Sequence, residues 1–208
     1  MAGEDLWPMT HRERERVADL LAGIAPEQWD QPSLCAGWQV RDVAAHLIAT
    51  AETTPGSFIG GFVSSGFKFH DFSRKNLARW SGLGPDEMVA AMRASAGRTT
   101  KPPGPPAVPL TEAVVHGHDI ARPLGLGLDT GADALVASLD FYKGAQPLIG
   151  GKKRSAGLHW QATDVDWTYG SGPAVSGPAA ALLLVLSGRR DGLHGLEGDG
   201  VAELTSRM

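Results

Sequence analysis

Two side chains in the segment PLTEAVVHGHDIARPLG have the spacing of metal ligands on one helix. Glu112 and His116 are four residues apart, so a helix places the carboxylate and the imidazole on the same face. A third possible ligand is His46 in the segment AGWQVRDVAAHLIA, provided that its helix faces the first. One carboxylate and two imidazoles form an open three-ligand set, as in catalytic zinc sites. The spacing therefore predicts a metal centre with room for water or a substrate.

Asp119 lies three residues after His116 and continues the same helix face. It could orient a histidine ligand, or it could accept a proton beside the metal. An ordinary ion pair with Arg122, three residues further on, is the structural alternative. His118 is rotated by about 160° from His116 on a helix, so we do not expect it to bind the metal.

The predicted ligands also have interpretations that need no metal. A histidine within an Ala-rich helix, such as His46, is commonly a core residue with satisfied hydrogen bonds. A Glu–His pair four residues apart is common on solvated helix faces. The neighbours of Glu112, among them Leu110 and Val114, are apolar, which makes a solvated face less natural there.

The chain has a single cysteine, Cys35, which excludes an internal disulfide and fits a reducing compartment. A thiolate beside the start of a helix would be reactive or could bind a metal. The alternative is a small buried residue in the turn before the helix, and we expect this second role.

Length and charge restrict the class of protein. The 208 residues allow one full-sized domain, with or without a small appendage. A net charge of −4 provides no general attraction to nucleic acid or to an anionic membrane. The N-terminal segment lacks the apolar stretch of a signal peptide, and no segment approaches the roughly 20 apolar residues of a membrane span. We expect a cytoplasmic protein.

Apolar periodicity predicts a helical first part. We expect helices over residues 10–24, 85–97 and 131–146, and helices that begin near Trp38 and Pro109. Residues 54–72 carry glycine-punctuated phenylalanines, which predict irregular helix or a loop. That segment could be a lid over a cleft or, as we expect, a loop pinned to the core.

The pattern changes after Gly150. Alternating bulky residues predict a strand over 158–167, followed by a short strand over 174–176, a helix from Gly177 to Gly188, and a last strand over 201–205. The sequence thus predicts a helical bundle over residues 1–150 and a small α/β domain over residues 151–208.

Three segments together resemble a known family. QPSLCAGWQVRDVAAHLIA resembles the N-terminal signature of the mycothiol-dependent maleylpyruvate isomerase family, within the DinB-like superfamily. TEAVVHGHDIARPLG resembles the second signature of that family, and GLHWQATDVDWTYGSGPAVSGPAAALLLVLSGR resembles the small domain that often follows. The resemblance implies a mostly α fold, a DinB-like four-helix bundle followed by a small α/β C-terminal domain.

The resemblance also implies a set of site residues. The positions matching His46, Glu112 and His116 bind a divalent metal, most commonly zinc, and mycothiol is the cosubstrate. Asp119 and Arg189 then face the active centre. A guanidinium suits Arg189 to holding a substrate carboxylate, although it could instead interact with the end of its helix, and Arg190 competes for the role.

The predicted function is a metal-dependent and thiol-dependent isomerase or S-transferase. Its partners would be a small-molecule thiol and a small electrophilic, anionic substrate, without nucleic acid or membrane. Two alternatives come from other classes: a metal-dependent hydrolase, in which the metal activates water, and a non-catalytic metal-binding regulatory protein. An open three-ligand set speaks against a purely structural zinc, which normally has four protein ligands.

Overall fold

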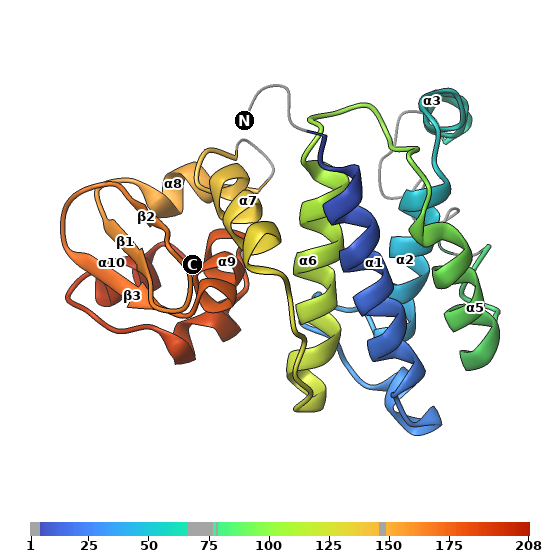
Figure 1. The fold of residues 1–208 in the computed structure, drawn as a ribbon, viewed down its shortest axis with the longest axis horizontal. Coiled ribbons are helices and arrows are strands. Elements are labelled where there is room, and N and C mark those ends of the chain that lie inside the picture. The colour runs from blue at the N-terminus through green and yellow to red at the C-terminus, as the bar shows by residue number, and fades with distance from the viewer. Residues whose placement is uncertain (1–4, 66–76, 78, 146–148) are drawn as a thin grey trace. The chain divides into compact units, whose positions relative to one another are not determined.

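The computed structural model describes residues 5–65, 77, 79–145 and 149–208, and the chain divides into two compact units (Figure 1). The units are Met1–Asp129 and Thr130–Met208, whereas the sequence predicts a division near Gly150. The difference arises from helix α7 (Ala132–Tyr142), which we expected in the bundle. It packs against α9 (Ala179–Leu186), which places it in the second unit.

The first unit is a four-helix bundle, as the sequence predicts. Its long helices are α1 (Trp7–Ala22), α2 (Val40–Glu52), α5 (Pro85–Ala96) and α6 (Val108–Ala121). Both α1 and α2 pack against both α5 and α6, so the four helices enclose one core (Figure 1). The short 3₁₀ helices η1 (Pro26–Asp30) and η2 (Arg122–Leu124) lie in the connections.

The core of the bundle consists of apolar side chains at helical spacing. Each fully buried Val, Leu, Ile or Met side chain contributes about 1.5–3 kcal/mol relative to an exposed one. Gly117 allows a close approach on α6, because a Cβ there would lie 2.6 Å from Leu128 Cδ2 and 3.0 Å from Val17 Cγ2. The fully or nearly fully buried members are Val17, Leu21, Trp29, Val43, Leu47, Ile48, Met88, Met92 and Ile120.

Helix α1 begins before the residue that its sequence predicts. A Thr10–Glu13 capping pattern predicts a start at Thr10, yet the helix starts at Trp7. The Thr10 hydroxyl and amide both donate to the carbonyl oxygen of Leu6, each at 2.9 Å. Thr10 therefore lies inside the first turn, and Pro8 occupies the position near the start where its missing N–H costs nothing.

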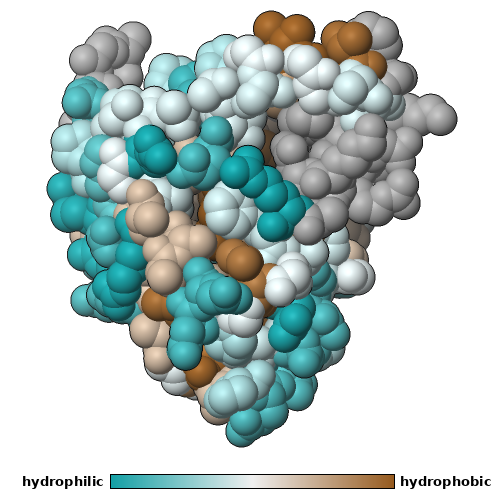
Figure 2. All heavy atoms as spheres, turned by 90° about the vertical axis from the view of Figure 1, so that its right-hand side faces the viewer, coloured by the Kyte–Doolittle hydropathy of each residue, from teal (hydrophilic) through white to brown (hydrophobic). Residues whose placement is uncertain are grey.

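The segment predicted as irregular helix or loop begins with α3 (Pro55–Ser64). Two of its apolar side chains, Ile59 and Val63, are 59% and 53% exposed. An apolar patch is visible over the top of the molecule in Figure 2, at the end where Figure 1 places α3. The phenylalanines after residue 65 lie outside the described residues, so the role of this segment stays a prediction.

The second unit is a small α/β domain, as predicted. Its sheet has the order β2-β1-β3, with β1 (His159–Ala162) antiparallel to β2 (Thr168–Tyr169) and parallel to β3 (Ala174–Gly177). Trp160 of β1 pairs with Tyr169 of β2 on one side and with Val175 of β3 on the other. The apolar helix α9 packs against β1, β3, α7 and α8 (Gly151–Ser155).

Two predictions for this unit are corrected. The strand predicted over 158–167 ends at Ala162, whose N–H donates to the Trp167 carbonyl at 3.0 Å and closes a turn before β2. The last strand predicted over 201–205 is wrong, since α10 (Val201–Ser206) is a helix that buries Leu204. η3 (Arg190–Gly195) precedes it. None of the helices in the described ranges is long and apolar enough to cross a membrane.

Asp140 provides a test of the second unit. Lys143 Nζ and Trp167 Nε1 donate to Asp140 Oδ1 at 2.6 and 3.1 Å. Burial opposes ionisation, but these hydrogen bonds outweigh it and lower the pKa of Asp140 below 3.8. We expect Asp140→Asn to lower the free energy of unfolding by about 1 kcal/mol near neutral pH. The pKa of Asp140 is lower in the folded state than in the unfolded state. The stability difference between wild type and Asp140→Asn should therefore have its full size above the unfolded-state pKa and disappear as the pH falls through the folded-state pKa.

Urea unfolding of the wild type and Asp140→Asn at several pH values measures this difference. Asp166→Asn is the matched control, because Asp166 is an exposed aspartate of the same unit. A stability difference that did not change with pH would contradict the assignment.

Candidate metal centre

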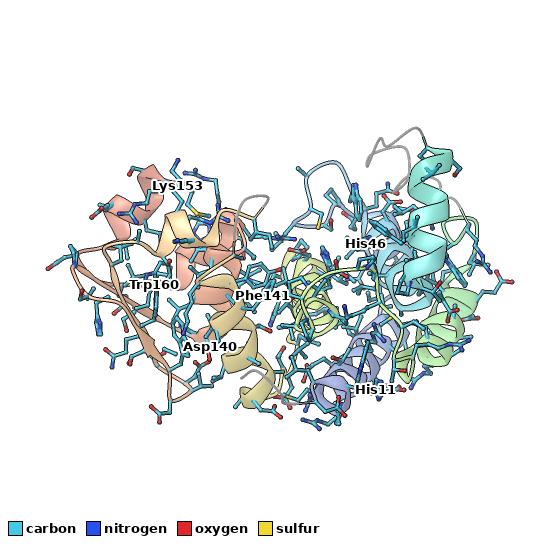
Figure 3. All side chains as sticks on the ribbon, turned by 90° about the horizontal axis from the view of Figure 1, so that it is seen from above. His11, His46, Asp140, Phe141, Lys153 and Trp160 are labelled. Carbon is cyan, nitrogen blue, oxygen red and sulfur yellow. The ribbon has the colours of Figure 1, made fainter. Side chains whose placement is uncertain are left out.

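The packing of α2 against α6 places His46 close to both Glu112 and His116, which α6 carries four residues apart. His46 Nε2 lies 4.0 Å from Glu112 Oε1, and the rings of His46 and His116 lie 5.0 Å apart between centroids at an angle of 83°. Figure 3 labels His46 on α2 within the bundle. The separation of His46 and Glu112 exceeds a hydrogen bond but allows both atoms to bind one ion after small side-chain adjustments.

The donor set fits a divalent metal such as zinc. Glu112 Oε2 is buried and has no hydrogen-bond partner among the described residues. A buried carboxylate oxygen without a partner is costly, and a cation would remove that cost. Two imidazoles and a carboxylate are ligands that zinc takes in catalytic sites. The side chains of His46 and Glu112 are 23% and 25% exposed, so the centre is accessible to a small molecule.

Burial shifts the pKa values of two of the proposed ligands, His46 and Glu112. It lowers the pKa of His46 from 6.5 to about 3, aided by the charge of His116, so this imidazole is neutral as a ligand must be. Burial raises the pKa of Glu112, and the charges of His116 and of the buried Arg14 of α1 oppose this increase. A positive charge close to Glu112 therefore favours its ionised form.

The third ligand is held by a carboxylate and a thiol. His116 Nδ1 lies 2.8 Å from Asp119 Oδ2, and Cys35 Sγ lies 3.1 Å from the same oxygen. Burial would lower the pKa of His116, but the hydrogen bonds with Asp119 and Cys35 outweigh it and raise the pKa to about 10. Asp119 is completely buried. The sequence allows Asp119 either to orient a histidine ligand or to accept a proton beside the metal, and its burial against His116 favours the first role.

A second possible ligand set shares His116. The ligand atoms of Cys35, His116 and Asp119 all lie within 4.8 Å of one another, and among the described residues this is the one group of three such side chains that is so close. The short contacts within this group, however, are hydrogen-bond distances, and the group leaves Glu112 Oε2 unsatisfied. We therefore retain His46, Glu112 and His116 as the proposed ligands.

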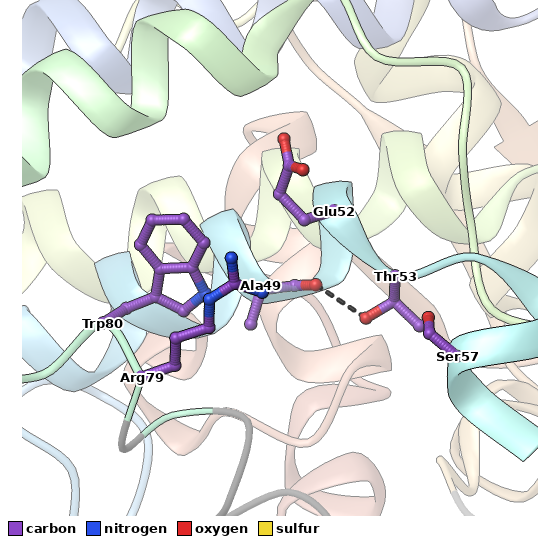
Figure 4. Close-up of a pocket in the computed structure, with 6 residues that line it drawn as sticks. All are labelled: Ala49, Glu52, Thr53, Ser57, Arg79 and Trp80. Carbon is purple, nitrogen blue, oxygen red and sulfur yellow. Dashed lines mark hydrogen bonds between the residues drawn. The ribbon is translucent and has the colours of Figure 1, made fainter. Parts of the chain in front are cut away.

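A small pocket lies along α2, beyond His46 in the direction of the end of the helix (Figure 4). Ala49 and Thr53 follow His46 by three and seven residues, so they lie on about the same helix face. Arg79 lies at this pocket, with its guanidinium carbon 5.1 Å from the centre of the Trp80 ring. The pocket has a volume of about 120 Å³ and is lined by Ala49, Glu52, Thr53, Ser57, Arg79 and Trp80.

The other residues singled out in the sequence are placed as follows. Arg189 follows α9 in the second unit, where its Nη1 donates to the Ser187 carbonyl at 2.9 Å, and its predicted role in catalysis stays a prediction. Arg190 donates to the carbonyl of Met208. His118 is 6% exposed, and burial followed by the charge of Arg122 lowers its pKa to about 4.

Sequence reasoning missed the contact of Cys35 with Asp119. We expected a small buried residue without a partner of this kind. The two residues are separated by 84 positions, so no local spacing reports the contact. The available signal was the position of the cysteine immediately before the helix that carries His46.

Comparisons with known proteins agree with the resemblance noted in the sequence. The model of the mycothiol maleylpyruvate isomerase N-terminal domain matches residues 10–104. The crystal structure of the mycothiol-dependent maleylpyruvate isomerase matches with a TM-score of 0.65 and 15% identity, over 93% of this chain and 91% of that chain. A mutant of that enzyme with a histidine replaced by alanine matches with a TM-score of 0.60 and 16% identity over the same shares. No curated protein sequence matches the chain significantly.

Removal of either histidine tests the metal centre. We expect His46→Ala and His116→Ala to abolish stoichiometric zinc binding, because each removes one of three protein ligands. Elemental analysis after zinc reconstitution measures the metal content, and circular dichroism checks that the bundle stays folded. His194→Ala is the control, since His194 is an exposed histidine of the second unit. Full occupancy in both variants would mean that other residues hold the metal.

Proposed function

Residues 10–104 form a mycothiol maleylpyruvate isomerase N-terminal domain, and on this basis we propose that the chain is a metal-dependent, thiol-dependent isomerase or S-transferase. The observation that carries the proposal is that His46 lies close to both Glu112 and His116 at the α2–α6 interface, with a buried Glu112 oxygen that lacks a partner among the described residues. A single reduced thiol in the chain is compatible with the cytoplasm as its location.

The residues of the chain have distinct tasks in this proposal. His46, Glu112 and His116 would hold a divalent cation, most suitably zinc, and Asp119 would keep the His116 ring in a fixed orientation. A divalent metal at this place supplies the lowered pKa that keeps a small-molecule thiol in its nucleophilic thiolate form at neutral pH. The neutral His46 and the partial exposure of His46 and Glu112 leave the centre accessible to that thiol.

The proposed substrate is a small anionic electrophile such as a cis-enoic acid. The thiol sulfur adds to one carbon of the double bond, the former double bond rotates, and elimination of the same thiol restores the double bond in the trans form. The thiol is thus regenerated, as an isomerase requires. In an S-transferase the addition product would be released.

The dependence on thiol separates this function from hydrolysis. Zinc-loaded protein should isomerise maleylpyruvate with mycothiol present and should show no turnover above the uncatalysed rate without it. The absorbance change of the substrate measures the reaction, and His116→Ala treated with zinc in the same way is the negative control. Turnover of a hydrolysable substrate without thiol would favour the metal-dependent hydrolase instead. Metal-dependent stability without any turnover would favour the regulatory protein.

Arg189 is the proposed anchor for the substrate carboxylate. Loss of a charged hydrogen bond to the substrate is expected to raise KM for an anionic substrate about tenfold in Arg189→Ala, with a smaller effect on kcat. Steady-state kinetics of Arg189→Ala and Arg190→Ala with the same substrate measure the effect. An unchanged KM in Arg189→Ala, together with an increase in Arg190→Ala, would transfer the role to the neighbouring arginine.

A further inference from the structure

The turn before α2 is built to place Cys35 against α6. The Ser33 hydroxyl accepts from the Cys35 amide at 3.1 Å and donates to the Trp38 carbonyl at 2.8 Å, which closes the turn. The Leu34 amide donates to the main-chain carbonyl of Asp119 at 3.1 Å, so the turn is attached to α6 directly beside the thiol. The position of the Cys35 side chain is therefore fixed by main-chain bonds on both sides.

One carboxylate oxygen accepts from two side chains at this place. Asp119 Oδ2 lies 2.8 Å from His116 Nδ1 and 3.1 Å from Cys35 Sγ, while Sγ and Nδ1 are 3.6 Å apart. An ionised carboxylate has only acceptors, so Nδ1 carries a proton and the thiol donates its own. Asp119 is completely buried, and a buried carboxylate depends on such donors.

We infer that Cys35 is a positioning residue, whose thiol fixes the Asp119 carboxylate and thereby holds the His116 ring through Nδ1, which leaves Nε2 as the nitrogen that a metal ion could bind. This inference rests on the metal site proposed at His116. It assigns Cys35 no covalent role and no bond to the metal. Partners that fix the tautomer of a histidine ligand in this way commonly affect metal affinity by 10–100-fold when they are lost.

The alternative is that Cys35, His116 and Asp119 themselves bind the metal, since their ligand atoms lie within 4.8 Å of one another. In that case the thiol would have to be a thiolate, and His116 would have to bind through Nδ1 rather than donate from it. The 2.8 Å and 3.1 Å contacts are those of donors with an acceptor, which favours the positioning role.

Three variants of the full chain test the inference. Cys35→Ala removes the donor, Cys35→Ser replaces it with a hydroxyl donor, and Ala36→Ser changes the exposed neighbour in the same turn. Zinc affinity is measured by competition with a chromophoric chelator. We expect Cys35→Ala to weaken zinc binding about tenfold, Cys35→Ser to restore most of the affinity, and Ala36→Ser to leave it unchanged.

Two further measurements do not depend on turnover. Long-range ¹H–¹⁵N NMR of the metal-free protein should show a protonated Nδ1 of His116 in the wild type and in Cys35→Ser, and a disturbed one in Cys35→Ala. The cobalt(II)-substituted wild type should lack a sulfur-to-metal charge-transfer absorption. If Cys35→Ala does not fold, the comparison of the wild type with Cys35→Ser and the cobalt spectrum still decides the matter.

The results that overturn the inference are distinct. Unchanged zinc affinity and an unchanged His116 signal in Cys35→Ala would remove Cys35 from the site. A sulfur-to-cobalt absorption in the wild type would make Cys35 a ligand. If no variant and no wild-type sample binds zinc, the proposed function fails, while the NMR signal of His116 still reports whether the thiol fixes its tautomer.

Discussion

The first unit depends on the burial of ionisable side chains between α2 and α6. Two imidazoles, two carboxylates and a thiol lie against helices whose other inward residues are mostly apolar. Isolated charges in such surroundings are strongly unfavourable, so each group needs a partner. Asp119 has its partners in His116 and Cys35, whereas one oxygen of Glu112 has none among the described residues. A bound cation at Glu112 would give that oxygen the partner it lacks among the described residues.

The rigidity of the bundle determines how well these groups are placed. His46 and the pair Glu112 and His116 sit in the middle of long helices rather than in loops, and sites on such elements are held more precisely. Gly117, directly after His116, lets α6 approach Val17 of α1 closely. Tight packing behind the site therefore limits the movement of the ligands, and thiol chemistry would proceed in a cavity whose walls change little.

The helices, and the places of the proposed ligands on them, were predictable from the sequence because their signals are local. The i,i+4 spacing of Glu112 and His116 and the apolar stripe around His46 are visible within single helices. Predictions from local sequence patterns were wrong where tertiary contacts determine the secondary structure or the unit to which a helix belongs. The residues around Val201 read as a strand, but burial of Leu204 selects a helix, and α7 joined the second unit because its partner is α9. The contact of Cys35 with Asp119 joins residues 84 positions apart, so no local spacing could predict it.

The attachment of the Leu34 amide to the Asp119 carbonyl has a consequence for the order of folding. The thiol and the carboxylate that meet there are 84 positions apart, so a long stretch of chain must close before they are neighbours. His46 leaves the ribosome well before Glu112 and His116 are synthesised. The nascent chain therefore has no complete set of ligands until α6 has docked on α2. An ion that needs all three proposed ligands can therefore find them only after α6 has docked on α2.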